Sequence, residues 1–281
     1  MEFEAARTEL AWTENRPRRG WLPRLDLAEL WSYRELAFFL ALRDLKLRYK
    51  QTVFGIAWAL IQPVAAMLLF TVIFGRLADV PSDGLPYAVF VFAGLAVWFY
   101  FSNSVEAAAE SLVEHRELVT KVYFPRLLAP IAAVLPGLVD LAVSLGLLAV
   151  VMIVSGVAPT GAAVLLPLWA LAAVGLAFAA GTWLAALNVL YRDVRYALGF
   201  FIQLWFFASP VVFSSSLFEG PWRYVYALNP VAGLIDGFRW AAVGAPAPGP
   251  EALVSLASGI LLLVGGLLYF GQVERRLADA I

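Results

Sequence analysis

Long apolar segments dominate the chain and predict an all-α integral membrane protein. A helix needs about 20 mostly apolar residues to cross the roughly 30 Å of hydrocarbon in a bilayer. Six segments meet this requirement, whereas residues 221–243 do not, because Arg223, Asp236 and Arg239 would be costly in lipid. We therefore expect six transmembrane helices, with short re-entrant helices between the fifth and the sixth. The predicted spans are residues 53–75, 87–107, 127–155, 160–188, 196–213 and 252–271.

The segment before the first predicted span has a different pattern. Residues 1–52 carry many charges and contain no apolar run long enough for a cleaved signal peptide. From residue 26 to residue 52, leucine and aromatic residues recur at roughly helical spacing, with basic residues between them. This pattern predicts an amphipathic helix that lies at the membrane surface.

The distribution of Lys and Arg predicts the orientation, because basic residues near span ends are retained on the cytoplasmic side. With six spans, 17 of the 20 Lys and Arg residues fall on one side, and only Arg76, Arg223 and Arg239 fall on the other. We expect a multi-pass plasma-membrane protein with both termini in the cytoplasm. Its parts would be a cytoplasmic tail (1–25), the interfacial helix (26–52), the six-span domain (53–271) and a cytoplasmic C-terminus (272–281).

Composition narrows the possible chemistry. Hydrophobic residues make up 62% of the chain, and the net charge of −1 gives no reason to expect a nucleic-acid partner. The absence of Cys and the single His exclude thiolate chemistry and His-cluster metal sites. None of the three lysines (Lys46, Lys50 and Lys121) follows a glycine, so the chain lacks the G-x-x-x-x-G-K-[ST] phosphate loop. We expect no catalytic residue, metal or cofactor here; if ATP is used, another chain hydrolyses it.

One acidic residue, Asp140, lies well inside a predicted span. It follows Pro136 and Gly137, a pair that can loosen a helix. A carboxylate at this depth is either a coupling or gating group or a structural acid that bonds to a neighbouring helix or a polar cavity. We favour the structural alternative.

Four motifs, in order, resemble those of a known family. They are RDLKLRYKQTVFGIAW at residues 43–58 with Gln62–Pro63, KVYFPR at 121–126, LNVLYRDV at 187–194, and SPV at 209–211 with LNP at 228–230 and Arg239. Together they resemble the permeases of bacterial ABC-type polysaccharide exporters, which export O-antigen, capsule and teichoic-acid polymers. Residues 115–117 depart from the family pattern.

The resemblance implies a half-transporter rather than an enzyme. Two copies of the permease would form the pore as a homodimer, and two copies of a separate ATPase subunit would bind ATP and Mg. The substrate would be a long glycan, linked to a lipid, that leaves the cytoplasm across the bacterial inner membrane. The alternatives are a related permease for drugs or lipids and a membrane-embedded glycosyltransferase.

Charged residues at the end of the second predicted span, and in the loop that follows it, suggest a docking surface. Glu106, Glu110, Glu114 and Glu117 share one helix face, and basic residues follow in a short loop. A mixed-charge helix end suits a protein partner, although a solvated helix end has the same pattern. With the resemblance, the predicted ATPase-coupling residues are Arg43, Asp44, Lys46, Arg48, Lys50, Glu110, Glu114, Arg116, Glu117, Lys121, Arg126, Arg192 and Asp193.

Aromatic residues suggest a translocation pathway, because aromatic faces can hold sugar rings without trapping a moving chain. The alternative for each ring is packing between helices or contact with lipid. The predicted pathway residues are Phe54, Trp58, Gln62, Trp98, Tyr100, Phe201 and Trp205.

Prolines divide residues 205–243 into pieces too short to span a membrane. Such pieces form either a gate of re-entrant helices or a surface loop, and the resemblance favours the gate. The predicted outer-gate residues are Pro210, Pro221, Asn229, Pro230 and Arg239.

Overall fold

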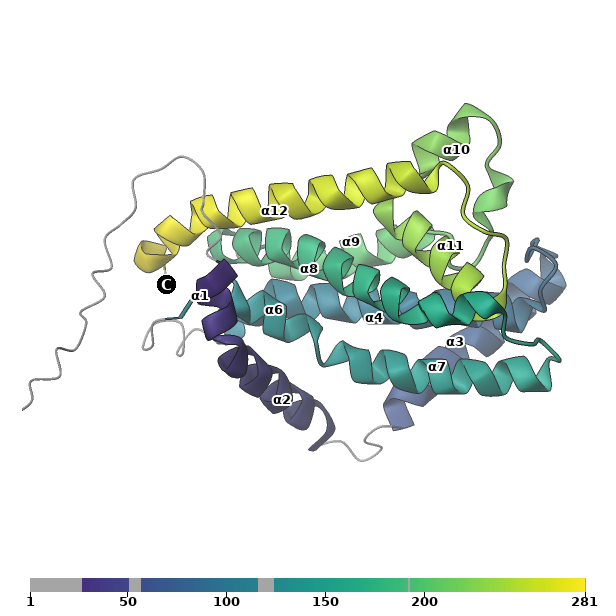
Figure 1. Ribbon diagram of the computed structural model, residues 1–281, viewed down its shortest axis with the longest axis horizontal. Helices are drawn as coiled ribbons and strands as arrows, with labels where there is room; N and C mark the ends of the chain where they lie inside the picture. Colours follow the sequence, from purple (N-terminus) through teal and green to yellow (C-terminus); the bar gives the residue numbers. More distant parts are fainter. Residues whose placement is uncertain (1–26, 51–56, 116–123, 192, 281) are drawn as a thin grey trace, which may run out of the picture.

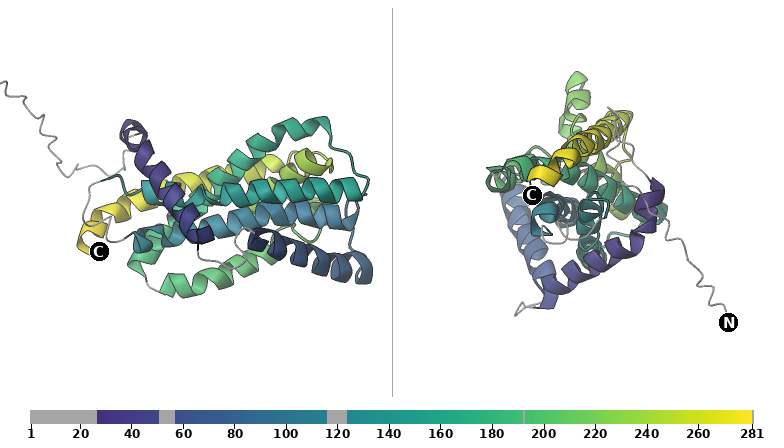
Figure 2. Two further views of the ribbon diagram at one scale, coloured as in Figure 1. Left: turned by 90° about the horizontal axis from the view of Figure 1, so that it is seen from below. Right: turned by 90° about the vertical axis from the view of Figure 1, so that its left-hand side faces the viewer.

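The computed structural model describes residues 27–50, 57–115, 124–191 and 193–280, and these ranges are helical with no β-strand among them. The long helices run side by side along the bundle, while α2 crosses it obliquely (Figures 1 and 2). The helices are α1 (Leu27–Ser32), α2 (Arg34–Lys50), α3 (Ala57–Phe70), η1 (Thr71–Leu77), α4 (Tyr87–Glu114), α6 (Leu128–Val134), α7 (Gly137–Val154), η2 (Gly161–Leu165), α8 (Leu166–Leu190), α9 (Asp193–Phe207), η3 (Ser215–Leu217), α10 (Pro221–Tyr226), α11 (Pro230–Val243) and α12 (Ala252–Ala280).

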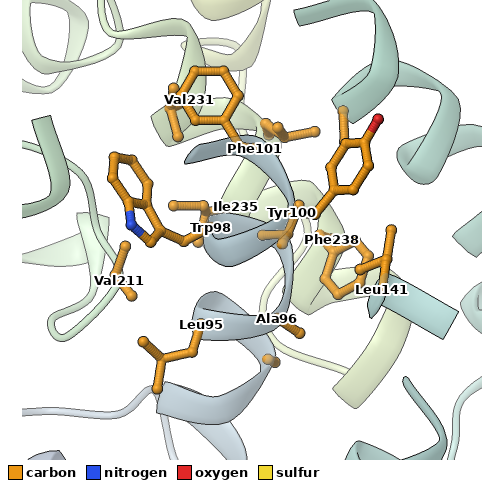
Figure 3. Packing of buried hydrophobic residues seen from close by; sticks show 14 of the residues in the cluster. Leu95, Ala96, Trp98, Tyr100, Phe101, Leu141, Val211, Val231, Ile235 and Phe238 are labelled. Atoms are coloured by element: carbon orange, nitrogen blue, oxygen red, sulfur yellow. The ribbon is translucent and has the colours of Figure 1, made fainter. Parts of the chain in front are cut away.

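Helix α4 is the centre of the bundle. It packs against α3, α6, α7, α8, α9 and α11, and most of its side chains are buried. Its apolar residues therefore face other helices all round, as expected for a helix that is hydrophobic on every side. Figure 3 shows this core, in which side chains of α4 meet α7 on one side and α11 on another.

Small residues allow α4 and α8 to pack closely. A Cβ atom added at Gly181 of α8 would lie 2.4 Å from the Cβ atom of Ala108 on α4, which is closer than two carbon atoms can approach. Thr182, Ala185 and Ala186 of α8 are also buried. Packing through small residues is the usual way for helices to associate within a membrane.

Five helical segments are long and apolar enough to cross a membrane, and each coincides with a predicted span. The remaining prediction, 196–213, falls on α9, which has 15 residues and ends at Phe207. A helix of that length extends about 22 Å, which is less than the hydrocarbon thickness. The six-span topology therefore stays a prediction. The five segments are Leu60–Leu77, Tyr87–Glu114, Leu128–Val154, Gly161–Leu190 and Ala252–Glu274.

Residues 221–243 form two short helices, as expected from the interrupting prolines and charges. Pro221 and Pro230 each stand at the first position of a helix, α10 with 6 residues and α11 with 14. Proline suits this position because its missing N–H would have no helical partner there. Neither helix is long enough to span a membrane, and their re-entrant character stays a prediction.

Helix α2 covers most of the predicted interfacial segment. It buries Ala37, Leu40 and Ala41 against residues of α6 and the segment before it, including Phe124 and Leu128. Phe38, Phe39 and Leu47 of α2 are exposed. Exposed apolar residues on a helix that also carries several basic ones are consistent with a position at the membrane surface.

Candidate functional site

Charged residues from five parts of the chain gather at one end of the bundle, the left-hand end in Figure 1. We term this end the charged end. We term the opposite end, which carries the connections on either side of η3 and α10, the loop end. The five charged parts are residues 27–50, 106–115, 124–127, 193–195 and 270–274, of which α2 runs from this end towards the middle of the bundle; the uncharged residues 188–191 lie among them.

Arg43 and Asp44 of α2 meet His115, which directly follows α4. The Arg43 Nη2 atom lies 2.5 Å from His115 Nε2 and 3.0 Å from Asp44 Oδ1. His115 is buried, with its Nδ1 atom 2.8 Å from the main-chain oxygen of Ser111. The oxygen can only accept and the guanidinium can only donate, so these partners assign the proton of the ring to Nδ1. Nε2 then accepts from Arg43.

A second contact joins α2 to α7. The Arg48 Nη1 atom lies 2.7 Å from Asp140 Oδ2, and 18% of the Asp140 side chain is exposed. This is the arrangement expected of an acid that holds a neighbouring helix. The structural role that we favoured for Asp140 stays a prediction.

Three further contacts link the helices of the charged end. Glu110 of α4 accepts from Arg195 of α9 at 2.9 Å. Asn188 of α8 donates to the main-chain oxygen of Ala109 at 3.0 Å. Arg126 donates at 3.0 Å to the main-chain oxygen of Glu274 on α12. Several predicted coupling residues thus hold the ends of helices together.

The other predicted coupling residues have different surroundings. Lys46, Lys50, Glu114 and Asp193 are all exposed. The remaining four, Arg116, Glu117, Lys121 and Arg192, lie outside the described residues. The structure therefore brings part of the predicted surface together, including Arg43, Asp44, Glu110 and Arg126.

The five predicted pathway residues whose side chains the structure describes do not form one surface. Trp98 and Tyr100 are buried within α4, where Trp98 contacts Phe206 and the Tyr100 hydroxyl donates to the main-chain oxygen of Val134 at 3.1 Å (Figure 3). Trp205 of α9 packs edge-on against Phe101 of α4, with the ring centroids 5.1 Å apart. These three residues pack inside the protomer.

By contrast, Phe201 of α9 and Gln62 of α3 are exposed on the outside of the protomer. Phe54 and the side chain of Trp58 lie outside the described part of the chain.

Asn229, predicted for the outer gate, connects α9 to α11. Its Oδ1 atom accepts from the N–H of Val231, which caps the start of α11, and also from Trp205 Nε1 at 2.9 Å. Its Nδ2 atom donates to the main-chain oxygen of Ala208 and to Ser209, each at 3.0 Å. A single amide therefore satisfies groups at the end of one helix and the start of another.

Arg239 of α11 is buried at the loop end and bonds only to main-chain oxygens. Its Nε donates to Phe90 at 3.1 Å, its Nη1 to Pro210 at 2.6 Å and its Nη2 to Val211 at 2.5 Å. The guanidinium carbon also lies 3.6 Å from the centre of the Phe90 ring. One side chain therefore joins α11, α4 and the segment that follows α9.

A pocket of about 320 Å³ lies at the loop end between α10, α11 and α12. Arg223 and Glu251 form an ion pair at its wall, with 2.5 Å between Nη2 and Oε1. Burial raises the pKa of the Asp236 carboxyl, while Ser215 and Arg239 oppose the shift. In the described residues no group of three or more His, Cys, Asp or Glu could hold a metal ion.

Residues 35–243 match the family model described as ABC-2 type transporter. The chain belongs to the ABC-2 type transporter family. Its relatives include a Myxococcus xanthus protein named "O-antigen export system permease protein RfbA", which is 32% identical over 256 residues, 90% of this chain and 98% of that protein. Two Klebsiella pneumoniae proteins of the same name are 25% and 23% identical over 240 residues, 85% of this chain and 92% of each relative.

Family membership and the five apolar segments together show that this ABC-2 chain is a multi-pass membrane protein. The matched region begins in α2 and ends with α11, so it includes both the contacts of α2 and the Arg239 cluster. The family resemblance predicted from the motifs is confirmed.

Sequence reasoning missed three residues that hold the charged end of this ABC-2 chain. His115 contacts Arg43 of α2. Asn188 and Arg195 both bond to residues of α4. Asn188 stands within the LNVLYRDV motif, which could have indicated it. His115 is the single histidine of the chain, but it lies where the sequence departs from the family pattern.

Proposed function

We propose that this ABC-2 chain is the membrane-embedded permease subunit of an ATP-driven exporter that moves a lipid-linked, O-antigen-type polysaccharide across the bacterial inner membrane. The observation that carries the proposal is the 32% identity to a protein named as an O-antigen export permease, over 98% of that protein's length. Identity at this level along nearly the whole relative supports the same kind of cargo.

A separate ATPase subunit, present in two copies, would drive the transport. The lack of a phosphate loop in this sequence supports that division of labour. The charged end, with Glu114, Lys50 and Asp193 exposed, offers mixed charges to such a partner.

Two copies of the chain would form the pore. The interior of the described protomer is filled by α4 and its neighbours, with Trp98, Tyr100 and Phe101 among the packed residues. A passage for a sugar chain therefore fits better between two copies. Among the described side chains, Gln62 and Phe201 are exposed on the outside of one protomer and are accessible pathway candidates.

A transport assay tests this function directly. Inverted membrane vesicles that contain the permease and its co-purified ATPase are expected to take up lipid-linked O-antigen polysaccharide when ATP is added. Uptake of a drug or a simple lipid, without any glycan, would assign the chain to another branch of the family.

Glu114, which is exposed at the end of α4, and Glu117, which follows it in the sequence, are expected to support coupling to the ATPase. Reversing both charges, in Glu114→Lys with Glu117→Lys, should lower export per molecule of ATP hydrolysed at least fivefold while membrane insertion remains normal. The measurement is export and ATP hydrolysis by the same vesicles. The matched control is Glu219→Lys, an exposed acid near the loop end, which should behave as wild type. Normal coupling in the double variant would contradict the docking role.

Cysteine labelling tests the predicted orientation, since the chain has no Cys of its own. We expect a cysteine at Glu219 to react with a membrane-impermeant maleimide added to intact cells. One at Ser32 should react only after the membrane is opened. The Lys and Arg asymmetry motivates this result. Labelling of both positions from the same side would refute the proposed arrangement.

A further inference from the structure

Helix α2 is attached to the body of the protein at three places, and two of them are polar. The apolar attachment consists of Ala37, Leu40 and Ala41 against residues 124–132. The polar ones are the Arg43–His115 contact with α4 and the Arg48–Asp140 ion pair with α7. The covalent path from α2 leads to a different helix, α3, through residues 51–56.

The Arg48–Asp140 pair would be costly to separate. Asp140 belongs to the apolar segment Leu128–Val154, and its side chain is mostly buried. Without Arg48, its carboxylate would lose this ion pair in surroundings where water is scarce. The pair therefore favours conformations in which α2 and α7 stay together.

The Arg43–His115 contact acts on the other side of α2. His115 donates to the end of α4 through Nδ1 and accepts from Arg43 through Nε2, so the ring bridges the two helices. Asp44 keeps the guanidinium in place, with 3.0 Å between Asp44 Oδ1 and Arg43 Nη2. Displacing α2 would leave the buried ring nitrogen without this donor.

We propose that these two contacts clamp α2 to α7 and α4 throughout the transport cycle, so that α2 moves with them as one body. Asp140 and His115 are then positioning residues that carry movement from the charged end into the bundle. The inference rests on the proposed function, in which an ATPase binds at that end. It differs from a hinge, in which α2 would swing away from α7 and pull on α3.

Cysteine crosslinking distinguishes a clamp from a hinge, because no native Cys competes with introduced ones. In the full complex with its ATPase, Arg48→Cys with Asp140→Cys should lower export per assembled complex at least fivefold, since the ion pair is lost. A short, reducible bis-methanethiosulfonate that joins the two cysteines should restore export to within twofold of wild type. Reduction should abolish the gain, and Asp140→Cys alone should gain nothing from the reagent.

Two outcomes would overturn the clamp. Export that falls further on crosslinking and recovers on reduction would show that α2 must leave α7. Wild-type export in the double cysteine variant before crosslinking would show that the pair is not needed. If the cysteine variant does not assemble, the charge exchange Arg48→Asp with Asp140→Arg replaces it. The exchange should recover export lost in Asp140→Arg, and no recovery would overturn the proposal.

The same samples separate failure of the clamp from failure of the proposed function. If wild-type vesicles export no glycan, the proposed cargo is wrong. The clamp is then measured by ATP hydrolysis, which requires no knowledge of the cargo. A clamp predicts that the crosslinked complex hydrolyses ATP within twofold of the wild-type rate, whereas a hinge predicts inhibition to below a fifth of it.

Discussion

Replacing Arg239 by leucine is expected to lower the free energy of unfolding by about 3 kcal/mol, because the main-chain oxygens of Pro210 and Val211 would lose this donor and that of Phe90, within α4, would keep only its helical partner. Each buried acceptor left without a partner costs about 1–3 kcal/mol. Removing a buried cation offsets part of this sum, since burying the charge is itself unfavourable. Burial lowers the pKa of Arg239 to about 10, so the side chain is charged at neutral pH.

The measurement is the thermal unfolding of purified protein in detergent, together with the yield of monodisperse protein. Arg76→Leu is the matched control, since Arg76 is an exposed arginine in η1. Substitutions of exposed residues usually change stability by less than about 0.5 kcal/mol, so this control should melt at nearly the wild-type temperature. Equal melting temperatures for the two variants would show that Arg239 does not hold the loop end together.

The long apolar runs were sufficient to predict most of the helices. Hydrophobic length located five helical segments that are long and apolar enough to cross a membrane, where only helices and closed barrels satisfy the backbone. The run at 196–213 is equally apolar, yet α9 ends at Phe207. The residues that follow include Ser209, which accepts from Asn229, and Pro210, which cannot donate a helical hydrogen bond. A hydropathy pattern cannot predict the contact between Ser209 and Asn229, which are 20 residues apart in the sequence.

The charged end could be located from sequence, but its pairs could not. Arg43 and His115 are 72 residues apart, and nothing in local spacing indicates that they meet. The acids on one face of α4 were apparent, whereas the choice of Arg195 as the partner of Glu110 depends on how α9 lies against α4. Tertiary packing decides such pairs.

The aromatic pathway shows a different limit. The number of aromatic residues in α4 is plain from the sequence, but a pathway requires a helix with an accessible face. Because α4 is surrounded by other helices, Trp98 and Tyr100 point into packed interfaces (Figure 3). Periodicity finds the buried face of a helix only when the helix has an exposed one.

A single methyl group is expected to disturb the contact between α4 and α8. In Gly181→Ala the new Cβ would lie 2.4 Å from that of Ala108, so the two helices would have to move apart. Overpacking of this kind costs about 1–3 kcal/mol, and Gly181→Leu should leave little folded protein.

Gly175 offers a matched control in the same helix, because a Cβ atom added there meets nothing within 4 Å. Gly175→Ala should leave the melting temperature unchanged or raise it, since alanine favours a helix over glycine by about 1 kcal/mol. Thermal unfolding of the two alanine variants in the same detergent therefore separates helix propensity from packing. The quantity compared is the difference in melting temperature between two Gly→Ala variants of the same helix, six residues apart. Changes in solubility or expression affect both variants alike. If Gly181→Ala were as stable as Gly175→Ala, close approach of α4 and α8 could not be what holds the centre of the bundle.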